Sequence, residues 1–326
     1  MPIPPPITAT TNIRRLDPRR DLEVVADLIE EAFQLKNDPD GQIILRQMRS
    51  YAQRQRFESN LLLLPGAPDG FVWVEDGQIV GNISLIPYFT NFKRKFLIAN
   101  VAVTPDHRQK GIATALTRQA LRFTHQWPDS EIWLQVRSEN QSAIHLYQGQ
   151  GFRFIHAITQ WKHPSSGRYF SPEPPNHLEG LKITDRVISD WSAQSVWLDL
   201  NYPKETRWYL DVEFQDFSPW SWLNPTRWSG LSKLHHLTLR EKEKPAGVLT
   251  WQETNLSADQ FWLALPASAQ EDQQAQWLLG SFLANKKPAR PLTLEYPYGR
   301  AMEGLEQAGF VISRHLNWMK YFHSSK

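Results

Sequence analysis

Residues 100–116, NVAVTPDHRQKGIATAL, are the stretch that decides the fold of this chain. Residues 101–103 end a mainly apolar run, which predicts a buried strand, and residues 104–106 close it with turn formers. From Ile112 onward, apolar residues recur at helical spacing. The segment 108–113 is therefore expected at the first turn of a helix.

This junction between strand and helix has the chemistry of a phosphate site. The first backbone N–H groups of a helix have no partner inside it and carry the positive end of its dipole. Gly111 would let the backbone approach a ligand closely, and Arg108 and Lys110 add positive charge. The structural alternative is a capped helix start whose two basic side chains are simply solvated.

The pattern Arg-x-x-Gly-x-Ala behind Val-Ala-Val-x-Pro resembles the coenzyme A signature of the GNAT acetyltransferase superfamily. A second segment typical of the family is residues 140–152, NQSAIHLYQGQGF. It predicts a helix that ends at Gly149 and Gly151, before a strand that begins at Phe152. The resemblance covers residues 13–161.

The resemblance implies an α/β (α+β) architecture, the GNAT fold, with a mixed, mostly antiparallel central sheet flanked by helices. The apolar periodicity agrees, because it predicts a strand, two helices, three strands, a helix, a strand, a helix and a strand. Strands are expected at 13–16, 71–74, 79–86, 96–103, 132–136 and 152–161, and helices at 22–33, 42–57, 112–123 and 140–147.

The second half of the chain repeats the first. The shift that places Gly309-Phe310 on Gly151-Phe152 also carries Ala143 to Ala301. We therefore expect two GNAT-like domains in tandem, at 1–163 and 179–326, joined by a Pro- and Ser-rich linker at 164–178.

The second domain is expected to be degenerate. Where the first has residues 108–113, the second has 266–271, PASAQE, with no glycine and no basic residue. The acidic pair Glu271-Asp272 would repel a pyrophosphate, so this domain is not expected to bind coenzyme A in the usual way.

Composition limits the other possibilities. The 326 residues include 36 Lys and Arg against 34 Asp and Glu, a net charge of +2, so no global field favours nucleic acid or a membrane. The absence of cysteine excludes disulfides, thiolate zinc sites and a cysteine nucleophile, and no metal is expected. The start lacks the pattern of a signal peptide, and no apolar stretch could span a bilayer, so a cytoplasmic protein is expected.

The resemblance implies that acetyl-coenzyme A is the co-substrate. Its pantetheine arm would run beside the central strand, where a backbone N–H could hold the thioester oxygen as it gains charge. The implied contacts are the main chains of Val101, Ala102 and Val103 for pantetheine, and those of Arg108, Gln109, Lys110, Gly111, Ile112, Ala113 and Thr114 for pyrophosphate. Asn140 could cap its helix or meet the coenzyme arm.

Tyr147 is the candidate general acid, because family position and chemistry agree on it. The departing thiolate must be protonated, and a phenol can be the donor; the alternative is a half-buried structural tyrosine. No general base is assigned. The acidic and histidine residues near the central strand, none of which reads clearly as a base, are Glu75, Glu131, Glu139, His107 and His145. The candidates for the acceptor side are Tyr51, Asn82, Ser84, Tyr88 and Phe89.

These features predict an N-acetyltransferase that moves an acetyl group directly to a primary amine in a ternary complex. The alternative from another class is a non-catalytic acetyl-coenzyme A sensor, for which the missing base is the clue. Transfer to a hydroxyl, or of a longer acyl group, is a further possibility. The acceptor, a small molecule or a peptide, is left open, and a monomer is expected with a homodimer as the alternative.

Overall fold

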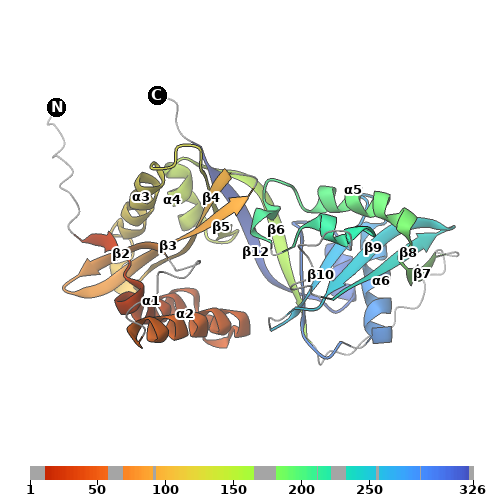
Figure 1. The fold of residues 1–326 in the computed structure, drawn as a ribbon, viewed down its shortest axis with the longest axis horizontal. Helices are drawn as coiled ribbons and strands as arrows, with labels where there is room; N and C mark the ends of the chain where they lie inside the picture. The colour runs from red at the N-terminus through yellow and green to blue at the C-terminus, as the bar shows by residue number, and fades with distance from the viewer. Residues whose placement is uncertain are drawn as a thin grey trace. The chain divides into compact units, whose positions relative to one another are not determined.

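The computed structural model describes residues 12–57, 69–90, 93–164, 181–210, 212–221, 233–254, 257–286 and 288–322 (Figure 1). The chain forms two compact units. The first contains Met1–Val136, Asn140–Ile155 and Trp318–Lys326, and the second contains Arg137–Glu139 and His156–Asn317. Among the described residues, no helix is long and apolar enough to cross a membrane.

The first unit is a twisted sheet in the order β1-β2-β3-β4-β5-β12. Neighbours from β1 to β4 are antiparallel, and β4 with β5 is parallel. Its strands are β1 (Ile13–Arg15), β2 (Asp69–Glu75), β3 (Gln78–Thr90), β4 (Lys93–Val103), β5 (Glu131–Arg137) and the end of β12 (Val311–Tyr321). Its helices are α1 (Pro18–Phe33), α2 (Pro39–Phe57), α3 (Ile112–Thr124) and α4 (Gln141–Gly149), with short 3-10 turns at Leu35–Asn37 and Pro105–His107.

Alternation along the strands gives this sheet two apolar faces. Phe71 packs in the core under α3 and α4, while its neighbour Val72 packs in the core under α1 and α2. Figure 1 shows the two helix pairs on opposite sides of the sheet. The family resemblance implied a sheet flanked by helices, and α1 and α3 each carry one apolar stripe that packs on it.

The second unit repeats the plan with the strand order β6-β11-β10-β9-β8-β7. Its strands are the end of β6 (Phe152–His163), β7 (Leu181–Asp185), β8 (Leu234–Glu241), β9 (Lys244–Gln252), β10 (Asp259–Ala264), β11 (Leu292–Pro297) and the start of β12. Its helices are α5 (Trp191–Asn201), α6 (Glu271–Lys286) and α7 (Met302–Gln307), with 3-10 turns at Ile188–Asp190, Arg207–Tyr209 and Phe214–Phe217. The internal repeat expected from the sequence is thus present in three dimensions.

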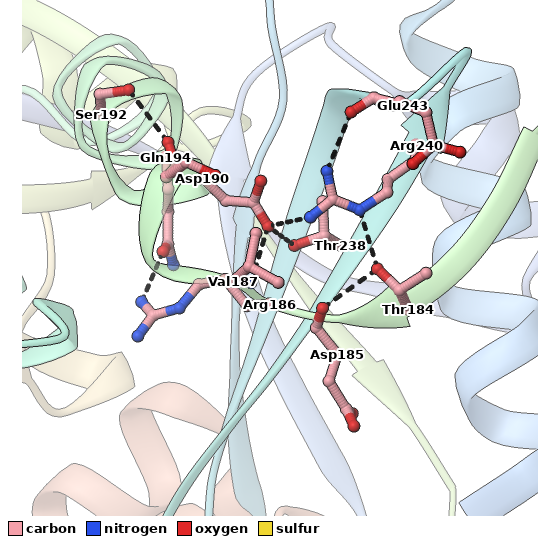
Figure 2. A network of polar contacts seen from close by, with 11 residues as sticks. Thr184, Asp185, Arg186, Val187, Asp190, Ser192, Gln194, Thr238, Arg240 and Glu243 are labelled. Atoms are coloured by element: carbon pink, nitrogen blue, oxygen red, sulfur yellow. Dashed lines mark hydrogen bonds and ion pairs between the residues drawn. The ribbon is translucent and has the colours of Figure 1, made fainter.

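A buried aspartate at the start of the first helix marks the repeat in both units. In the first unit, Asp21 accepts the backbone N–H of Asp17 at 2.7 Å and pairs with Arg14 at 2.9 Å. In the second, Asp190 accepts the backbone N–H of Val187 at 2.9 Å and pairs with Arg240 at 2.6 Å (Figure 2). Each buried carboxylate thus joins the turn before its helix to an arginine of the sheet, Arg14 on β1 or Arg240 on β8, and the arginine pairs its charge.

The compact units do not follow a single cut at residue 163. From Ile158 onward, β6 pairs antiparallel with β11, and the residues from His156 onward belong to the second unit. Conversely, Trp318 and Met319 at the end of β12 are 0% and 1% exposed, and residues from Trp318 onward belong to the first unit. The expected linker at 164–178 lies outside the described residues, apart from residue 164.

Candidate functional site

The strands β4 and β5 are paired along only part of their length. The parallel register joins residues 95–98 to residues 131–134 and stops there. Among the described residues, no strand pairs with residues 99–103 on the side of β5. The main-chain groups of that stretch can therefore pair with an extended ligand, as they would with another strand.

A β-bulge lies inside the same stretch. Ser84 opposes Ala99 and Asn82 opposes Ala102, so that Ile83 alone faces both Asn100 and Val101. Asn100 takes the left-handed conformation, with φ of 52°. Asparagine is the side chain other than glycine that most readily adopts it. This bulge was not predicted from the sequence, although the lone Asn100 in an apolar strand was a signal that could have indicated it.

The loop after β4 leads to the start of α3. The Arg108 Nε donates to the Val103 carbonyl at 3.1 Å, which ties the loop back to the end of the strand. Gln109 and Gly111 have φ of 61° and 79°, so the backbone turns sharply before α3 begins at Ile112. Among the residues that the structure describes, no side chain caps this helix start, and a Cβ built on Gly111 would meet no atom within 4 Å. The amide groups of this turn are therefore accessible to an anion.

The structure brings together the residues predicted to contact pantetheine and pyrophosphate on these two adjoining segments, whereas Asn140 lies at the start of α4. Ile112 is 3% exposed and belongs to the core, while Gln109 and Lys110 are exposed and Ala113 and Thr114 are half-buried. Ile112 can therefore contact a ligand through its main chain but not through its buried side chain. Lys110 contributes positive charge at the rim.

Asn140 caps α4. Its side-chain oxygen accepts the backbone N–H of Ala143 at 3.1 Å and the hydroxyl of Ser142 at 3.0 Å. The structural role considered for this residue is confirmed. Contact with the coenzyme stays a prediction.

Tyr147 is placed by α4 in the core of the first unit and is 7% exposed. Its ring meets the edge of Phe152, with the ring centroids 5.8 Å apart. Burial raises the pKa of its hydroxyl above the usual range, so the group stays protonated throughout the neutral range. Among the described residues, none forms a hydrogen bond with this hydroxyl.

Glu131 is engaged as an ion-pair partner. Burial by itself would raise its pKa, but hydrogen bonds from Lys320, Lys95 and Trp133 outweigh it and lower the pKa to about 2. The Nζ of Lys320 and of Lys95 lie 2.7 and 2.9 Å from its carboxylate. This carboxylate cannot take a proton from an amine near neutral pH, because its conjugate acid is far too strong.

The other base candidates lie at the loop or on the surface. His107 contacts the Thr104 hydroxyl through Nδ1 at 2.9 Å, and its Nε2 is 3.7 Å from Glu75. Glu139 and His145 are exposed. None of these four residues lies in the part of β4 that is open on the side of β5.

On the face of the sheet covered by α1 and α2, Asn82, Ser84 and Asn100 form a polar cluster. Tyr51 of α2 packs against the same core, and its hydroxyl is buried without a hydrogen-bond partner among the described residues. Tyr88 is half-buried, whereas Phe89 is 70% exposed. Acceptor contacts by these residues stay predictions.

The equivalent region of the second unit is filled by its own side chains. The parallel register of β10 with β11 ends at Phe261, as the register of β4 with β5 ends early in the first unit. The Asn201 Nδ2 donates to the Leu263 and Leu265 carbonyls at 3.1 and 3.2 Å, and the Tyr202 hydroxyl accepts the Leu263 N–H at 3.1 Å. The strand edge that a pantetheine arm would use is therefore already occupied.

The first turn of α6 is also unsuited to a phosphate. Glu271, its first residue, is 8% exposed and pairs with Arg300 at 2.6 Å. The Tyr296 hydroxyl donates to the same carboxylate at 2.7 Å. A buried negative charge thus stands in the first turn of α6, where the first unit has Ala113 in the same alignment, and this accords with the expected loss of coenzyme binding in the second unit.

Comparisons with known proteins agree with this geometry. Residues 26–152 match the model of the acetyltransferase (GNAT) family. Streptothricin acetyltransferase from Streptomyces lavendulae is 33% identical over 79 residues, which are 24% of this chain and 41% of that protein. An N-alpha-acetyltransferase from Saccharolobus solfataricus is 28% identical over 113 residues, which are 32% of this chain and 68% of that protein. The chain thus spans less than half the length of the first relative.

The fold extends the likeness to the whole chain. The crystal structure of a GCN5-related N-acetyltransferase from Sphaerobacter thermophilus superposes with a TM-score of 0.56 and 16% identity, covering 94% of each chain. At that identity the likeness concerns the fold alone. The family match thus identifies the first unit as a GNAT domain, and the chain as a whole has the fold of two GNAT-like units in tandem.

Proposed function

We propose that the first unit transfers an acetyl group from acetyl-coenzyme A to a primary amine by direct attack in a ternary complex. The proposal rests on two adjoining backbone segments whose main-chain groups are available to a ligand. Within the described part of the chain, residues 99–103 have no strand partner on the side of β5, and they lead into the start of α3, where no described side chain caps the helix.

Each part of the coenzyme has a matching segment in this arrangement. The amides of the pantetheine arm can pair with Val101 and Val103 as an added strand would. The pyrophosphate can accept from the amides that begin at Gly111, where no side chain fills the space. Arg108 fixes the loop by its hydrogen bond to the Val103 carbonyl. Lys110 adds positive charge that attracts the phosphates.

The reaction balances with the groups that this unit provides. The amine lone pair attacks the thioester carbon, the carbonyl oxygen gains charge, and the Val101 N–H is placed to stabilise it. The tetrahedral intermediate then breaks the C–S bond. The amine gives up one proton as the amide forms, and the departing sulfur takes up one.

In this scheme, the Tyr147 hydroxyl interacts with the departing sulfur. A thiol has an ordinary pKa of about 8.5, below the raised pKa of the buried tyrosine. Full proton transfer from the phenol is therefore uphill, and we propose that its main contribution is a hydrogen bond to the developing thiolate. The net proton then comes from the amine through water, which accords with Glu131 being engaged elsewhere.

The acceptor is not named by the relatives. Their names refer to streptothricin in one case and to N-alpha acetylation in the other, so they support acetyl transfer and do not choose between acceptors. A screen of primary amines with the purified protein is the direct way to find it.

Calorimetric titration of acetyl-coenzyme A tests the binding site. We expect one site per chain in the wild type and loss of binding in Gly111→Glu, because the new carboxylate would stand at the phosphate position. Gly77→Glu is the matched control: Gly77 has φ of 78° against 79° for Gly111, its Cβ would also meet nothing within 4 Å, and it lies in the β2–β3 turn.

Three outcomes separate the alternatives. A wild type that does not bind acetyl-coenzyme A refutes the proposal. Equal loss of binding in both variants would show that the effect is not local to Gly111. Binding without acetylation of any amine in the screen, and without slow thioester hydrolysis, favours the sensor function instead.

A further inference from the structure

A buried side chain on the neighbouring strand β3 forms a hydrogen bond to the bulge in β4. Asn82 is 0% exposed, and its Nδ2 donates to the Asn100 carbonyl at 2.9 Å. The Ser84 hydroxyl lies 3.3 Å from the side-chain amides of both Asn82 and Asn100. The three residues form a closed polar cluster that spans β3 and β4.

This contact fixes the orientation of one peptide group. The carbonyl of Asn100 and the N–H of Val101 belong to the same peptide, and in a trans peptide they point in opposite directions. Because Asn82 holds the carbonyl, the Val101 N–H must point away from Asn82. That N–H is the group to which the proposed reaction assigns the thioester oxygen.

The conformation held in this way is one that most residues avoid. A φ of 52° at Asn100 lies in the left-handed region, which asparagine adopts more readily than most residues but less readily than glycine. Such a conformation persists only where surrounding contacts determine it. Asn82 and Ser84 are those contacts on the side of β3.

Asn82 also lowers the stability of the fold in a way that an apolar residue at this position would avoid. Among the described residues, its side-chain oxygen has no hydrogen-bond partner although it is buried. A buried polar atom without a hydrogen-bond partner lowers the stability of the fold, and an apolar side chain at this position would remove that cost. The presence of an amide at this position is therefore best explained by its hydrogen bond to the Asn100 carbonyl.

We propose that Asn82 is a positioning residue for acetyl transfer, which orients the Val101 N–H toward the thioester oxygen through the Asn100 carbonyl. The inference rests on the proposed function of the first unit. It predicts that removing the Asn82 amide weakens the polarisation of the thioester carbonyl while coenzyme binding persists, since the phosphate contacts lie elsewhere.

Infrared spectroscopy of bound acetyl-coenzyme A carrying 13C at the acetyl carbonyl measures that polarisation directly and needs no acceptor. In the wild type we expect the carbonyl band to move to lower wavenumber on binding. In Asn82→Ala the band should return toward its position in free solution. Slow thioester hydrolysis should fall by about 10²-fold, the usual effect of losing one oxyanion donor. Affinity for desulfo-coenzyme A, measured by calorimetry, should change less than about threefold.

Thr124→Val is the matched control. Thr124 is 1% exposed, and its hydroxyl donates to the Leu121 carbonyl at 2.8 Å near the end of α3. It loses a buried hydrogen bond of the same unit, so it should lower the melting temperature without moving the carbonyl band. A band shift equal to that of Asn82→Ala would show that general destabilisation is enough, and would overturn the inference.

Asn82→Asp covers the case in which the alanine variant does not fold. The carboxyl has the shape of the amide and can donate only while protonated, so the wild-type band should return as the pH is lowered through the raised pKa of this buried acid. If wild type and both variants bind acetyl-coenzyme A with the same band at every pH, the inference is refuted while the proposed function stands. If the wild type does not bind, the proposed function itself fails.

Discussion

At the scale of single residues, Tyr147 and Asn82 show how the same core supports two different chemical roles. Tyr147 is held protonated by burial, and its ring packs on Phe152. Asn82 acts on the backbone of the neighbouring strand. Neither role depends on a charged side chain, so the proposed site works mainly through placed hydrogen-bond donors.

Tyr147→Phe should lower kcat about 10²-fold and leave the dissociation constant of acetyl-coenzyme A nearly unchanged, because only the hydroxyl is removed. Steady-state kinetics with an amine found in the screen, and calorimetry, are the measurements. Tyr321→Phe is the control, since Tyr321 packs on the same Phe152 ring at 5.5 Å. An unchanged kcat in Tyr147→Phe would remove it from the mechanism.

The raised pKa of Tyr147 also predicts the alkaline limb of the pH profile. A phenol that stays protonated beyond its ordinary pKa of about 10 cannot produce a fall in kcat below that pH. We expect kcat to rise as the acceptor amine deprotonates and then to stay level up to about pH 10. A decline in kcat near pH 8 that Tyr147→Phe abolishes would contradict the burial argument.

At the scale of elements, the ion pairs of Glu131 tie β5 to its neighbours β4 and β12 within the first unit. The pKa of this carboxyl is about 2, lower than the ordinary value of 4.5. A lowered pKa means that the stabilisation is present above pH 4.5 and is lost as the pH falls toward 2.

Glu131→Gln should therefore reduce the free energy of unfolding by about 2 kcal/mol at pH 7, after allowing for solvent screening of a partly exposed pair. The difference from wild type should shrink steadily between about pH 5 and pH 2, where the wild-type carboxyl takes up its proton. Urea denaturation across this pH range checks both points. A difference that does not depend on pH would show that packing, and not charge, is lost.

At the scale of the whole molecule, the two units are not consecutive segments of the chain. Trp318 and Met319 lie in the core of the first unit, where the Trp318 ring meets the edge of Trp133 at 6.2 Å. The first unit is thus complete only when the last strand of the chain has been added.

A fragment that ends at residue 164 should fail to fold stably, although it contains the whole family match. The loss of two fully buried side chains costs about 3–6 kcal/mol by burial alone, a large part of the stability of an ordinary domain. Thermal denaturation and hydrogen exchange of the fragment measure this. Addition of a peptide of residues 311–322 should restore protection, whereas a stable fragment that binds the coenzyme by itself would refute the expectation.

Most of the secondary structure could be predicted from the sequence, because it depends on local patterns. The apolar stripes of α1 and α3, the turn residues after β4 and the glycine before α3 all act over a few residues, and the structure confirms each element they predicted. The same holds for the internal repeat, which a single shift of the sequence exposes.

The sequence by itself determined the strand, loop and helix that make the candidate coenzyme site, since these follow from neighbouring residues. The tertiary structure decided three other features: the bulge held by Asn82, the occupation of the β10 edge by Asn201, and the place of Trp318 in the first unit. Each depends on contacts between residues tens to hundreds of positions apart along the chain. No local propensity encodes such contacts, because they form only when distant strands and helices come together.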